Sequence, residues 1–269
     1  MAKERVDVLC VEQGLFESRE KAKRAIMAGL VHDDHQKLDK PGMKIPTDTI
    51  LAIKGEKLKY VSRGGLKLEK AISSFDLDLK GKIMLDIGSS TGGFTDCALQ
   101  NGAVRVYALD VGTNQLVWKL RNDERVIVME QTNFRYCTLD DFKEGQPEVA
   151  SIDVSFISLS HIFAALKNIL VPGGHVAALI KPQFEAGREQ VGKHGIVKDS
   201  KVHTEVIKKV IGYAIENGFS IQGLTYSPIT GGEGNIEFLG HFVLEKGKDM
   251  PFDIESVVKE AHYHFERGE

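Results

Sequence analysis

Apolar residues recur along most of the chain in short runs that alternate with longer amphipathic stretches. The short runs are typical of buried strands, and the amphipathic stretches are typical of helices that cover a sheet. From residue 82 onward the predicted strands are 82–87, 104–110, 126–130, 149–154, 175–180, 219–227 and 236–244. The predicted helices are 92–101, 114–121, 158–169, 200–217 and 254–266. This order predicts an α/β fold with a doubly wound, mostly parallel sheet of seven strands.

The last two predicted strands are joined by the loop 227–235, without a helix between them. A parallel neighbour needs a crossover of about a dozen residues or more. We therefore expect these two strands to pair antiparallel at one edge of the sheet. A seven-stranded sheet with such a hairpin resembles the layout of class I (Rossmann-like) methyltransferases.

The N-terminal residues follow a different pattern, which predicts a small domain at 1–60 before a second domain at 61–269. Apolar residues at helical spacing predict a first helix over 5–15, with Gly14 in its C-terminal turn. Ser18 is placed to cap a second helix, 19–28, which Gly29 closes and whose outer side is basic. A β-like run follows at 50–53.

A basic stretch from Lys54 to Lys70 joins the two predicted domains. Its charged residues are Lys54, Glu56, Lys57, Lys59, Arg63, Lys67, Glu69 and Lys70. Six basic and two acidic side chains leave a local excess of four positive charges. Such a stretch would attract the phosphates of RNA.

The composition excludes several classes of protein. The chain has 269 residues, 42% of them hydrophobic, and a net charge of −3, so any attraction to nucleic acid must come from local basic clusters. It contains neither a run long enough for a membrane helix nor a signal-peptide segment after Met1, so we expect a cytoplasmic protein without membrane contact. Cys10, Cys97 and Cys137 are odd in number and widely spaced, which indicates neither disulfides nor a zinc site.

Residues 83–94, Ile-Met-Leu-Asp-Ile-Gly-Ser-Ser-Thr-Gly-Gly-Phe, predict a strand, a glycine-rich turn and the start of a helix. This is the arrangement of a nucleotide-binding loop. A dinucleotide fingerprint would need glycine at position 90, where Ser90 stands. Asp86 at the strand end would repel a pyrophosphate but would suit the ammonium and sulfonium groups of S-adenosylmethionine. Asp110, at the end of the next strand, is placed to accept hydrogen bonds from ribose hydroxyls.

The predicted cofactor is therefore S-adenosylmethionine. Its predicted binding residues are Asp86, Gly88, Ser89, Ser90, Gly92, Gly93, Phe94, Asp110, Asn133 and Asp153. No metal site is predicted, because the histidines are scattered and are interpreted as surface or helix residues; they include His161, His175, His194 and His203.

Three further polar residues lie at or next to predicted strand ends, where the sites of open α/β sheets form. They are Asp153, Lys181 and Glu237. Taken singly, each could be a structural residue: a turn former, a helix cap or an outward-facing strand residue. Together with Lys67 they make an alternating Lys-Asp-Lys-Glu set.

The first sixty residues resemble the S4 RNA-binding module of ribosomal protein S4 and pseudouridine synthases. The matching positions are Arg5, Asp7, Leu9, Gly14, Ser18, Arg19, Ala22, Ile26, Gly29 and Val31. One departure is Asp34-His35, in a turn where the family often has a glycine. That module lays the start of its second helix on RNA, so the resemblance implies phosphate contacts from this helix. We add Arg63 of the basic connector as a further phosphate contact. The predicted RNA-binding residues are Ser18, Arg19, Lys21, Lys23, Arg24 and Arg63.

Nearly the whole chain resembles the TlyA family, in which an S4 module is joined to an FtsJ-like ribose 2′-O-methyltransferase and which is often labelled haemolysin. The matching stretches are 60–68, 86–96, 153–159, 180–185 and 231–238. The resemblance implies that Lys67, Asp153, Lys181 and Glu237 form the catalytic set. It also implies an enzyme that methylates cytidines of ribosomal RNA in assembled ribosomal subunits, and we expect this enzyme to be a monomer.

A ribose 2′-hydroxyl is a weak nucleophile, so the site must help its proton leave and align its oxygen with the methyl sulfonium. Lys181 would meet that hydroxyl, either as a base or as a cation that stabilises the developing alkoxide. The sequence does not decide between these roles. Asp153 and Glu237 would orient the two lysines and balance their charge.

Other functions fit the sequence less well. Base methylation of exocyclic amines needs an N-P-P-Y-type stretch where this chain has Asp-Val-Ser-Phe at 153–156, and C5 methylation needs a cysteine near there. A ribosome assembly factor that binds RNA without turnover would not need Asp86, Asp110 and the full catalytic set. A haemolysin would need a signal peptide, a membrane helix or a series of amphipathic β-hairpins.

Overall fold

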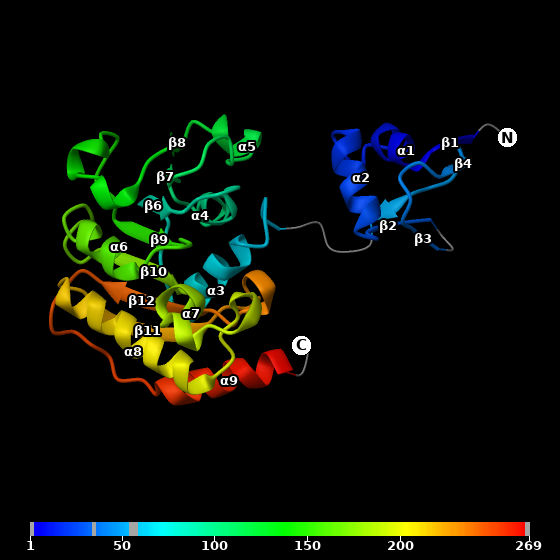
Figure 1. Ribbon diagram of the computed structural model, residues 1–269. Coiled ribbons are helices and arrows are strands. Elements are labelled where there is room, and N and C mark those ends of the chain that lie inside the picture. Colours follow the sequence, from blue (N-terminus) through cyan, green and yellow to red (C-terminus); the bar gives the residue numbers. More distant parts are fainter. Residues whose placement is uncertain (1–2, 34–35, 54–58, 267–269) are drawn as a thin grey trace. The chain divides into compact units, whose positions relative to one another are not determined.

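The computed structural model describes residues 3–33, 36–53 and 59–266. The chain divides into two compact units, Met1–Lys59 and Tyr60–Glu269 (Figure 1). Some predictions lie outside the described residues: the turn at Asp34 and His35, and the connector positions Lys54, Glu56 and Lys57.

The smaller unit packs two helices against short antiparallel strands. Its elements are β1 (Lys3–Arg5), α1 (Val6–Glu12), α2 (Arg19–Met27), β2 (Val31–His32), β3 (Lys37–Leu38), β4 (Lys44–Pro46) and β5 (Ala52–Ile53). Strand β1 pairs with β4, and β2 lies between β3 and β5. Val6, Leu9 and Ile26 are buried in its core. This α+β unit is the predicted S4-type fold.

The helix ends in this unit follow the capping residues. Ser18 is the N-cap of α2 and accepts a hydrogen bond from Lys21 N, as predicted, and Gly29 follows its end with a φ of +70°. Helix α1 is shorter than predicted at both ends. Arg5 belongs to β1, and the turn through Gly14, whose φ is +72°, follows directly after Gln13.

The larger unit is built on one seven-stranded sheet. Its strands are β6 (Ile83–Ile87), β7 (Arg105–Leu109), β8 (Val126–Met129), β9 (Val149–Ile152), β10 (His175–Ile180), β11 (Ser220–Tyr226) and β12 (Phe238–Val243). The order across the sheet is β11-β12-β10-β9-β6-β7-β8. Strand β12 is antiparallel to both of its neighbours, and the pairs from β10 to β8 are parallel. The predicted mostly parallel sheet with an antiparallel edge hairpin is confirmed.

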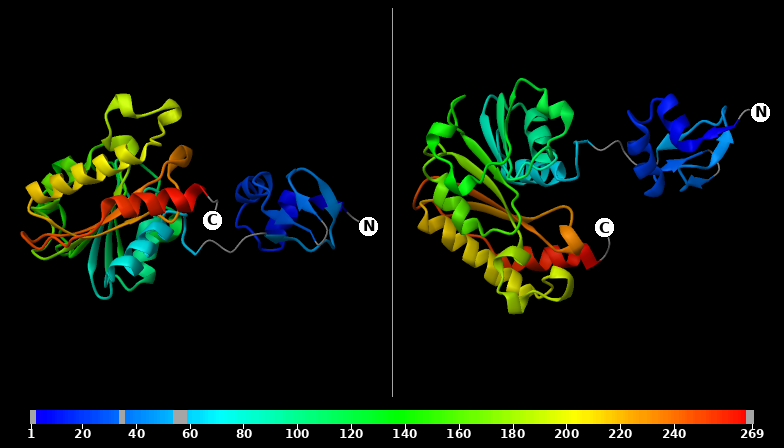
Figure 2. Two further views of the ribbon diagram at one scale, coloured as in Figure 1. Left: turned by 90° about the horizontal axis from the view of Figure 1, so that it is seen from below. Right: turned by 45° about the horizontal axis from the view of Figure 1, so that its top comes forward.

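Helices cover both faces of this sheet (Figure 2). They are α3 (Gly65–Phe75), α4 (Gly93–Gln100), α5 (Trp118–Arg121), α6 (Leu159–Leu166), α7 (Pro182–Glu185), α8 (Ser200–Glu216) and α9 (Ile254–Glu266). Short 3₁₀ turns lie at Phe134–Tyr136, Leu139–Asp141, Arg188–Gln190, Lys193–Gly195 and Gly232–Gly234. The core beside α6, α8 and α9 is separate from the core beside α3, α4 and α5.

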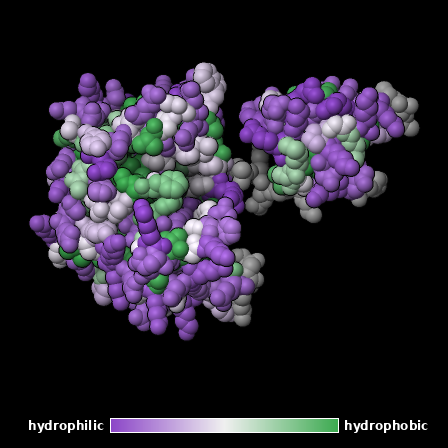
Figure 3. Space-filling view, in the orientation of Figure 1, coloured by the Kyte–Doolittle hydropathy of each residue, from purple (hydrophilic) through white to green (hydrophobic). Residues whose placement is uncertain are grey.

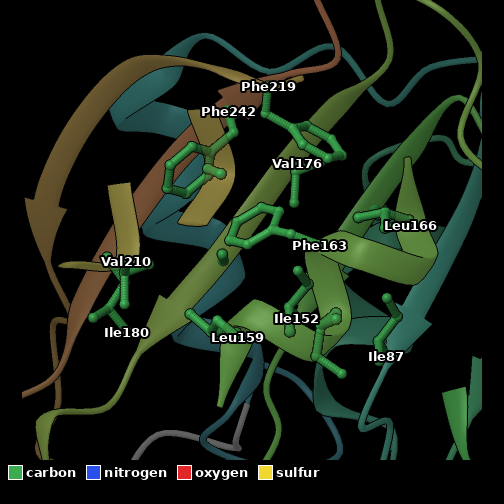
Figure 4. Packing of buried hydrophobic residues seen from close by; sticks show 14 of the residues in the cluster. Ile87, Ile152, Leu159, Phe163, Leu166, Val176, Ile180, Val210, Phe219 and Phe242 are labelled. Carbon is green, nitrogen blue, oxygen red and sulfur yellow. The ribbon is translucent and has the colours of Figure 1, made fainter. Parts of the chain in front are cut away.

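Successive strand residues enter different cores. Leu85 and Ile87 of β6 lie in the core beside α6, and Met84, which precedes them, lies in the core beside α3 and α4. In the first core the ring of Phe163 lies 5.2 Å from Phe219 and 5.1 Å from Phe242 between centroids (Figure 4). Because both faces are buried, the strands read as continuous apolar runs.

Helix α5 is shorter than the predicted range 114–121 because a side chain takes its first amides. The carboxylate of Glu130 accepts hydrogen bonds from the backbone N–H groups of Asn114, Gln115 and Leu116, at 2.9, 3.1 and 3.3 Å. These residues therefore form a loop around the carboxylate, and the helix begins at Trp118.

The visible surface of both units is mostly hydrophilic, with hydrophobic residues gathered near the middle of the face of the larger unit that Figure 3 shows. Among the described residues, no helix is long and apolar enough to cross a membrane.

Candidate active site

Three members of the predicted catalytic set meet at one edge of the sheet. Asp153 directly follows β9 and Lys181 directly follows β10, so both lie at the carboxyl ends of parallel strands. Glu237 precedes β12, which runs the other way and pairs its first residue, Phe238, with Ile180. The antiparallel direction of β12 thus brings Glu237 to the edge that carries the other two residues.

The fourth member, Lys67, comes from the first turn of α3. The start of this helix approaches α4 closely, because Gly93 has no side chain in the way. A Cβ atom added at Gly93 would lie 2.3 Å from Ser62 Oγ and 2.8 Å from Gly65 N. Gly93, predicted to bind the cofactor, therefore serves the packing that carries Lys67 into the site.

The predicted catalytic set forms two ion pairs. Lys181 Nζ lies 2.5 Å from Asp153 Oδ1 and donates to Ser155 Oγ at 3.2 Å. Lys67 Nζ lies 2.6 Å from Glu237 Oε2, and the side-chain amide of Gln183 donates to Glu237 Oε1 at 3.2 Å. Each lysine thus has one carboxylate partner, and the charges of the set balance.

The two ion pairs differ in their access to solvent. The side chains of Lys67 and Glu237 are 9% and 2% exposed, whereas those of Lys181 and Asp153 are 11% and 21% exposed. Lys67 and Glu237 therefore form the inner pair. Lys181 and Asp153 form the outer pair, in which the carboxylate is the more exposed group.

A cavity of about 280 Å³ lies beside the outer pair. Five of the predicted cofactor residues line it: Gly88, Ser90, Asp110, Asn133 and Asp153. Apolar residues form much of the remaining wall: Ile87, Leu109, Val111, Phe134, Val154, Phe156, Ile157 and Ile162. The cavity thus has an apolar wall and carboxylates at two of the strand ends.

The turn at this cavity depends on Gly88. Its φ is +89°, and a Cβ atom there would lie 2.2 Å from the backbone oxygen of Asp153. Asp110 holds the same turn, because its carboxylate accepts hydrogen bonds from Ser90 N and Gly112 N, both at 2.8 Å. Each of these oxygens retains a second lone pair, so Asp110 can still accept a hydrogen bond from a ligand.

Asp86, which was predicted to bind the cofactor, lies behind the cavity wall. It is fully buried and is not among the residues that line the cavity. Its carboxylate accepts hydrogen bonds from Thr95 Oγ1 at 2.7 Å and Ser151 Oγ at 3.0 Å, and burial raises its pKa to about 7. Strand alternation turns Ile87 toward the cavity and Asp86 toward α4.

Four other predicted cofactor residues also lie outside the cavity lining: Gly93, described above, and Ser89, Gly92 and Phe94. Ser89 is buried, and Phe94 packs in the core beside α4. A Cβ atom at Gly92 would lie 2.3 Å from Leu120 Cδ1, so this glycine lets the loop pack on α5. The structure thus gives these residues positions that support the loop.

The sequence analysis did not single out Phe156, which lies at the cavity. Its side chain is 90% exposed, its φ is +63°, and its ring centroid lies 4.8 Å from that of Phe184. A large apolar residue in an unusual backbone conformation at an exposed position is a candidate for ligand contact. The sequence offered one signal for a site position, because Phe156 lies three residues after Asp153 at a predicted strand end.

Asn235 was also missed as a structural residue of the site. It is buried, and its Oδ1 accepts a hydrogen bond from Val197 N at 3.0 Å. Its Nδ2 donates to the carbonyl oxygens of Gly195 and Gly232 at 3.0 and 3.1 Å. Asn235 thereby joins the loop at 192–197 to the loop that leads into Glu237.

Among the four histidines interpreted as surface or helix residues, His203 lies in α8 but is buried. Its Nε2 lies 3.0 Å from Val197 O, its Nδ1 lies 3.0 Å from His262 Nε2, and burial lowers its pKa to about 4. Within the described ranges, no group of three or more His, Cys, Asp and Glu side chains is arranged to hold a metal ion.

The predicted RNA-binding residues of the smaller unit lie on or before α2. Arg19 Nη2 lies 2.9 Å from the buried Asp7, which Arg5 also contacts at 2.8 Å. The hydrogen bond from Arg5 lowers the pKa of Asp7 to about 2. Lys23 forms an ion pair with Glu20 at 2.8 Å, and Lys21 forms one with Glu17. Arg24 is exposed, and so is Arg63 of the larger unit. Arg19 therefore has a structural contact in addition to its predicted role.

Comparison with known proteins gives two family matches. Residues 60–243 match the FtsJ-like methyltransferase family, and residues 4–51 match the S4 domain. The chain is 62% identical over 265 residues to the Bacillus subtilis protein named "Putative rRNA methyltransferase YqxC", covering 97% of this chain and 94% of that protein.

Two further relatives extend this result. The chain is 39% identical to the 16S/23S rRNA (cytidine-2′-O)-methyltransferase TlyA of Mycobacterium tuberculosis, with 87% of each protein covered. Its structure matches one entitled "Putative hemolysin from Streptococcus thermophilus" with a TM-score of 0.80 and 59% identity, covering 99% of this chain and 98% of that chain.

Proposed function

Because the chain belongs to the TlyA family of FtsJ-like methyltransferases, with an S4 domain before the catalytic domain, we propose that it methylates the ribose 2′-hydroxyl of ribosomal RNA. The methyl donor in this proposal is S-adenosylmethionine. The observation that carries it is the pair of Lys-carboxylate contacts on the carboxyl edge of the sheet, next to a cavity that Asp153 lines. Domain boundaries near Lys59 and Tyr60 agree with the two family matches.

The residues of the cavity fit this cofactor. Asp110 and Asn133 would bind its polar groups, with Asp110 accepting hydrogen bonds from the ribose, and the apolar wall would contact the adenine ring. The turn at Gly88 lets backbone approach closely, as a nucleotide-binding loop requires. When bound, the cofactor supplies an electrophilic methyl group. Asp86 would support the cofactor loop from its buried side, through its hydrogen bonds with Thr95 and Ser151.

Lys181 is the group that the 2′-hydroxyl would meet. Asp153 and Ser155 hold its Nζ at 2.5 and 3.2 Å, so the end of this long side chain is oriented before the substrate arrives. As an ammonium it would stabilise negative charge that develops on the 2′-oxygen, and as an amine it would take the proton. Lys67 and Glu237 would fix the inner wall, and Gln183 connects that pair to the loop after Lys181.

Phe156 would contact the target nucleotide. An exposed aromatic ring at a cofactor cavity offers a stacking surface to a base displaced from the RNA. In this proposal the smaller unit holds the ribosomal RNA through the basic side of α2 and through Arg63, and the target is cytidine in assembled ribosomal subunits of the cytoplasm. All members of the catalytic set come from one chain, which supports action as a monomer.

Methyl transfer from radiolabelled S-adenosylmethionine tests the proposal. The acceptors would be small ribosomal subunits, large ribosomal subunits and protein-free ribosomal RNA, followed by mapping of 2′-O-methyl groups. We expect label in ribose 2′-O-methyl cytidine of at least one subunit. Label in a base, or no label with any acceptor, would contradict the proposal.

RNA anchoring is tested separately with Lys23→Glu/Arg24→Glu, and Lys80→Glu as a control for a changed exposed charge in the larger unit. Loss of phosphate contacts should weaken ribosomal RNA binding and flatten its salt dependence. Equal binding by all three proteins would remove α2 from the proposed RNA surface.

A further inference from the structure

Glu185 is a buried carboxylate that joins two loops of the proposed active site. It ends α7 and is only 5% exposed. Its Oε1 accepts a hydrogen bond from Leu159 N at 2.7 Å, and its Oε2 accepts one from Ser158 Oγ at 2.8 Å. The contact therefore connects the end of α7 to the start of α6.

Both connected segments begin at a member of the outer ion pair. The segment 153–158 starts with Asp153 and leads into α6, and the segment 181–185 starts with Lys181 and forms α7. Asp153 and Lys181 contact each other at the strand ends, and Glu185 closes the other end of the same loop pair. The rings of Phe156 and Phe184 meet between these two contacts.

Helix capping alone does not account for this carboxylate. Ser158 already serves as the N-cap of α6, with Ser160 N 3.2 Å from its Oγ. Burying a carboxylate is costly unless it is well hydrogen-bonded, and burial raises the pKa of Glu185. The hydrogen bonds from Leu159 N and Ser158 Oγ offset part of that cost. Lys209 Nζ, from α8, donates to the backbone oxygen of Glu185 at 2.8 Å and holds it from the other side.

We infer that Glu185 is a positioning residue, which fixes the segment 153–158 to the segment 181–185 and so keeps Lys181 aligned with Asp153. This inference rests on the proposed function of the outer pair. The partners of Lys181 Nζ, Asp153 Oδ1 and Ser155 Oγ, lie on the segment 153–158, so the spacing of the two segments determines where Nζ is held. A displacement of about 1 Å can lower the rate of an oriented reaction on the order of a hundredfold.

Three variants separate this role from a general loss of stability. Glu185→Ala removes both acceptors and leaves Leu159 N without its partner. Glu185→Gln keeps an acceptor for Leu159 N, and its amide can donate to Ser158 Oγ, so it should preserve the connection. Asp199→Ala is the matched control, because it removes a carboxylate that accepts from Lys201 N at 2.8 Å at the start of α8.

Two measurements on the full chain decide the inference. One is kcat and KM for methyl transfer to ribosomal subunits at saturating S-adenosylmethionine. The other is amide hydrogen exchange of peptides that span 153–160, which needs no activity. We expect Glu185→Ala to lower kcat on the order of a hundredfold with little change in KM for RNA, and to exchange faster in 153–160. Glu185→Gln and Asp199→Ala should resemble the wild type in both.

The outcomes distinguish this inference from the proposed function. If the wild type does not methylate ribosomal RNA, the proposed function fails, and exchange in 153–160 still shows whether Glu185 orders the segment. Unchanged exchange and unchanged kcat in Glu185→Ala would overturn the positioning role. An equal loss of kcat in Asp199→Ala would overturn it too, because the loss would then follow from the removal of any helix cap.

Discussion

The Lys67 ammonium and the Glu237 carboxylate lie 2.6 Å apart, although 170 positions separate them in the chain. Both side chains are buried, so neither charge has water as an alternative partner. Removal of one member of such a pair leaves an uncompensated charge in the interior, which usually costs about 3–5 kcal/mol. The inner pair is therefore both a structural contact and a part of the proposed site.

These two roles separate in a double variant. Glu237→Ala should lower the free energy of unfolding by about 3–5 kcal/mol in chemical denaturation. Lys67→Met/Glu237→Leu removes both charges, so it should regain most of that stability. Methyl transfer should be abolished in both variants. A double variant as unstable as Glu237→Ala would contradict the account of the buried charge, and an active double variant would exclude the pair from catalysis.

Gly88 and Gly81 form a matched pair for testing the cofactor loop. Both have positive φ, +89° and +74°, but a Cβ at Gly88 meets Asp153 O at 2.2 Å whereas none of the described atoms lies within 4 Å of a Cβ at Gly81. Gly81→Ala should cost about 1–2 kcal/mol for the backbone conformation alone. Gly88→Ala should cost about 1–3 kcal/mol more and weaken S-adenosylmethionine binding in calorimetry. Equal stability and equal cofactor affinity in the two variants would show that the turn does not need glycine.

Asp86 predicts a specific dependence of stability on pH. Its pKa rises from 3.8 to about 7 on folding because the carboxyl is buried, so between these values the folded state retains a proton that the unfolded state releases. Its contribution to stability is therefore lost as pH rises from about 4 to about 7. Asp86→Asn keeps partners for Thr95 and Ser151 but does not titrate, so its stability relative to wild type should be greater at about pH 8 than at about pH 5. A stability difference that is the same at both pH values would contradict the raised pKa.

Phe156 should contribute to RNA recognition without contributing to the fold. Its ring is 90% exposed, so Phe156→Ala should leave the melting temperature nearly unchanged. Loss of stacking on a base is worth about 1–3 kcal/mol, which corresponds to a change of about fivefold to 150-fold in KM or kcat/KM for ribosomal RNA. Phe156→Trp, which keeps an aromatic surface, is the control and should retain activity. An Ala variant with wild-type kinetics would remove Phe156 from the substrate site.

The strands were predictable because each is an apolar run bounded by polar residues, and the antiparallel pairing of the last two follows from the short connection between them. The orientation of Asp86 was not, because both faces of β6 are buried and the sequence carries no polar alternation to show which side faces the cavity. The start of α5 was not predictable either. It depends on the Glu130 carboxylate, which binds amides that lie 14 to 16 positions earlier in the chain.

The meeting of Asp153, Lys181 and Glu237 at one edge of the sheet was predictable from strand-end positions, and Lys67 was added to them by the family resemblance. The roles of Glu185 and Asn235 were not, since each depends on contacts between loops that are 26 and 38 positions apart. Local sequence shows a glutamate and an asparagine in polar segments, which is common for solvated loops. Only the fold shows that both are buried.

The central claim is that Lys181 acts on the 2′-hydroxyl as the methyl group moves. The most direct measurement is the single-turnover rate of methyl transfer to ribosomal RNA by Lys181→Ala and the wild type, with cofactor and RNA affinities measured on the same preparations. We predict a loss of rate of about a hundredfold or more with both affinities nearly unchanged. A folded Lys181→Ala protein that methylates ribosomal RNA at a near wild-type single-turnover rate would contradict the account.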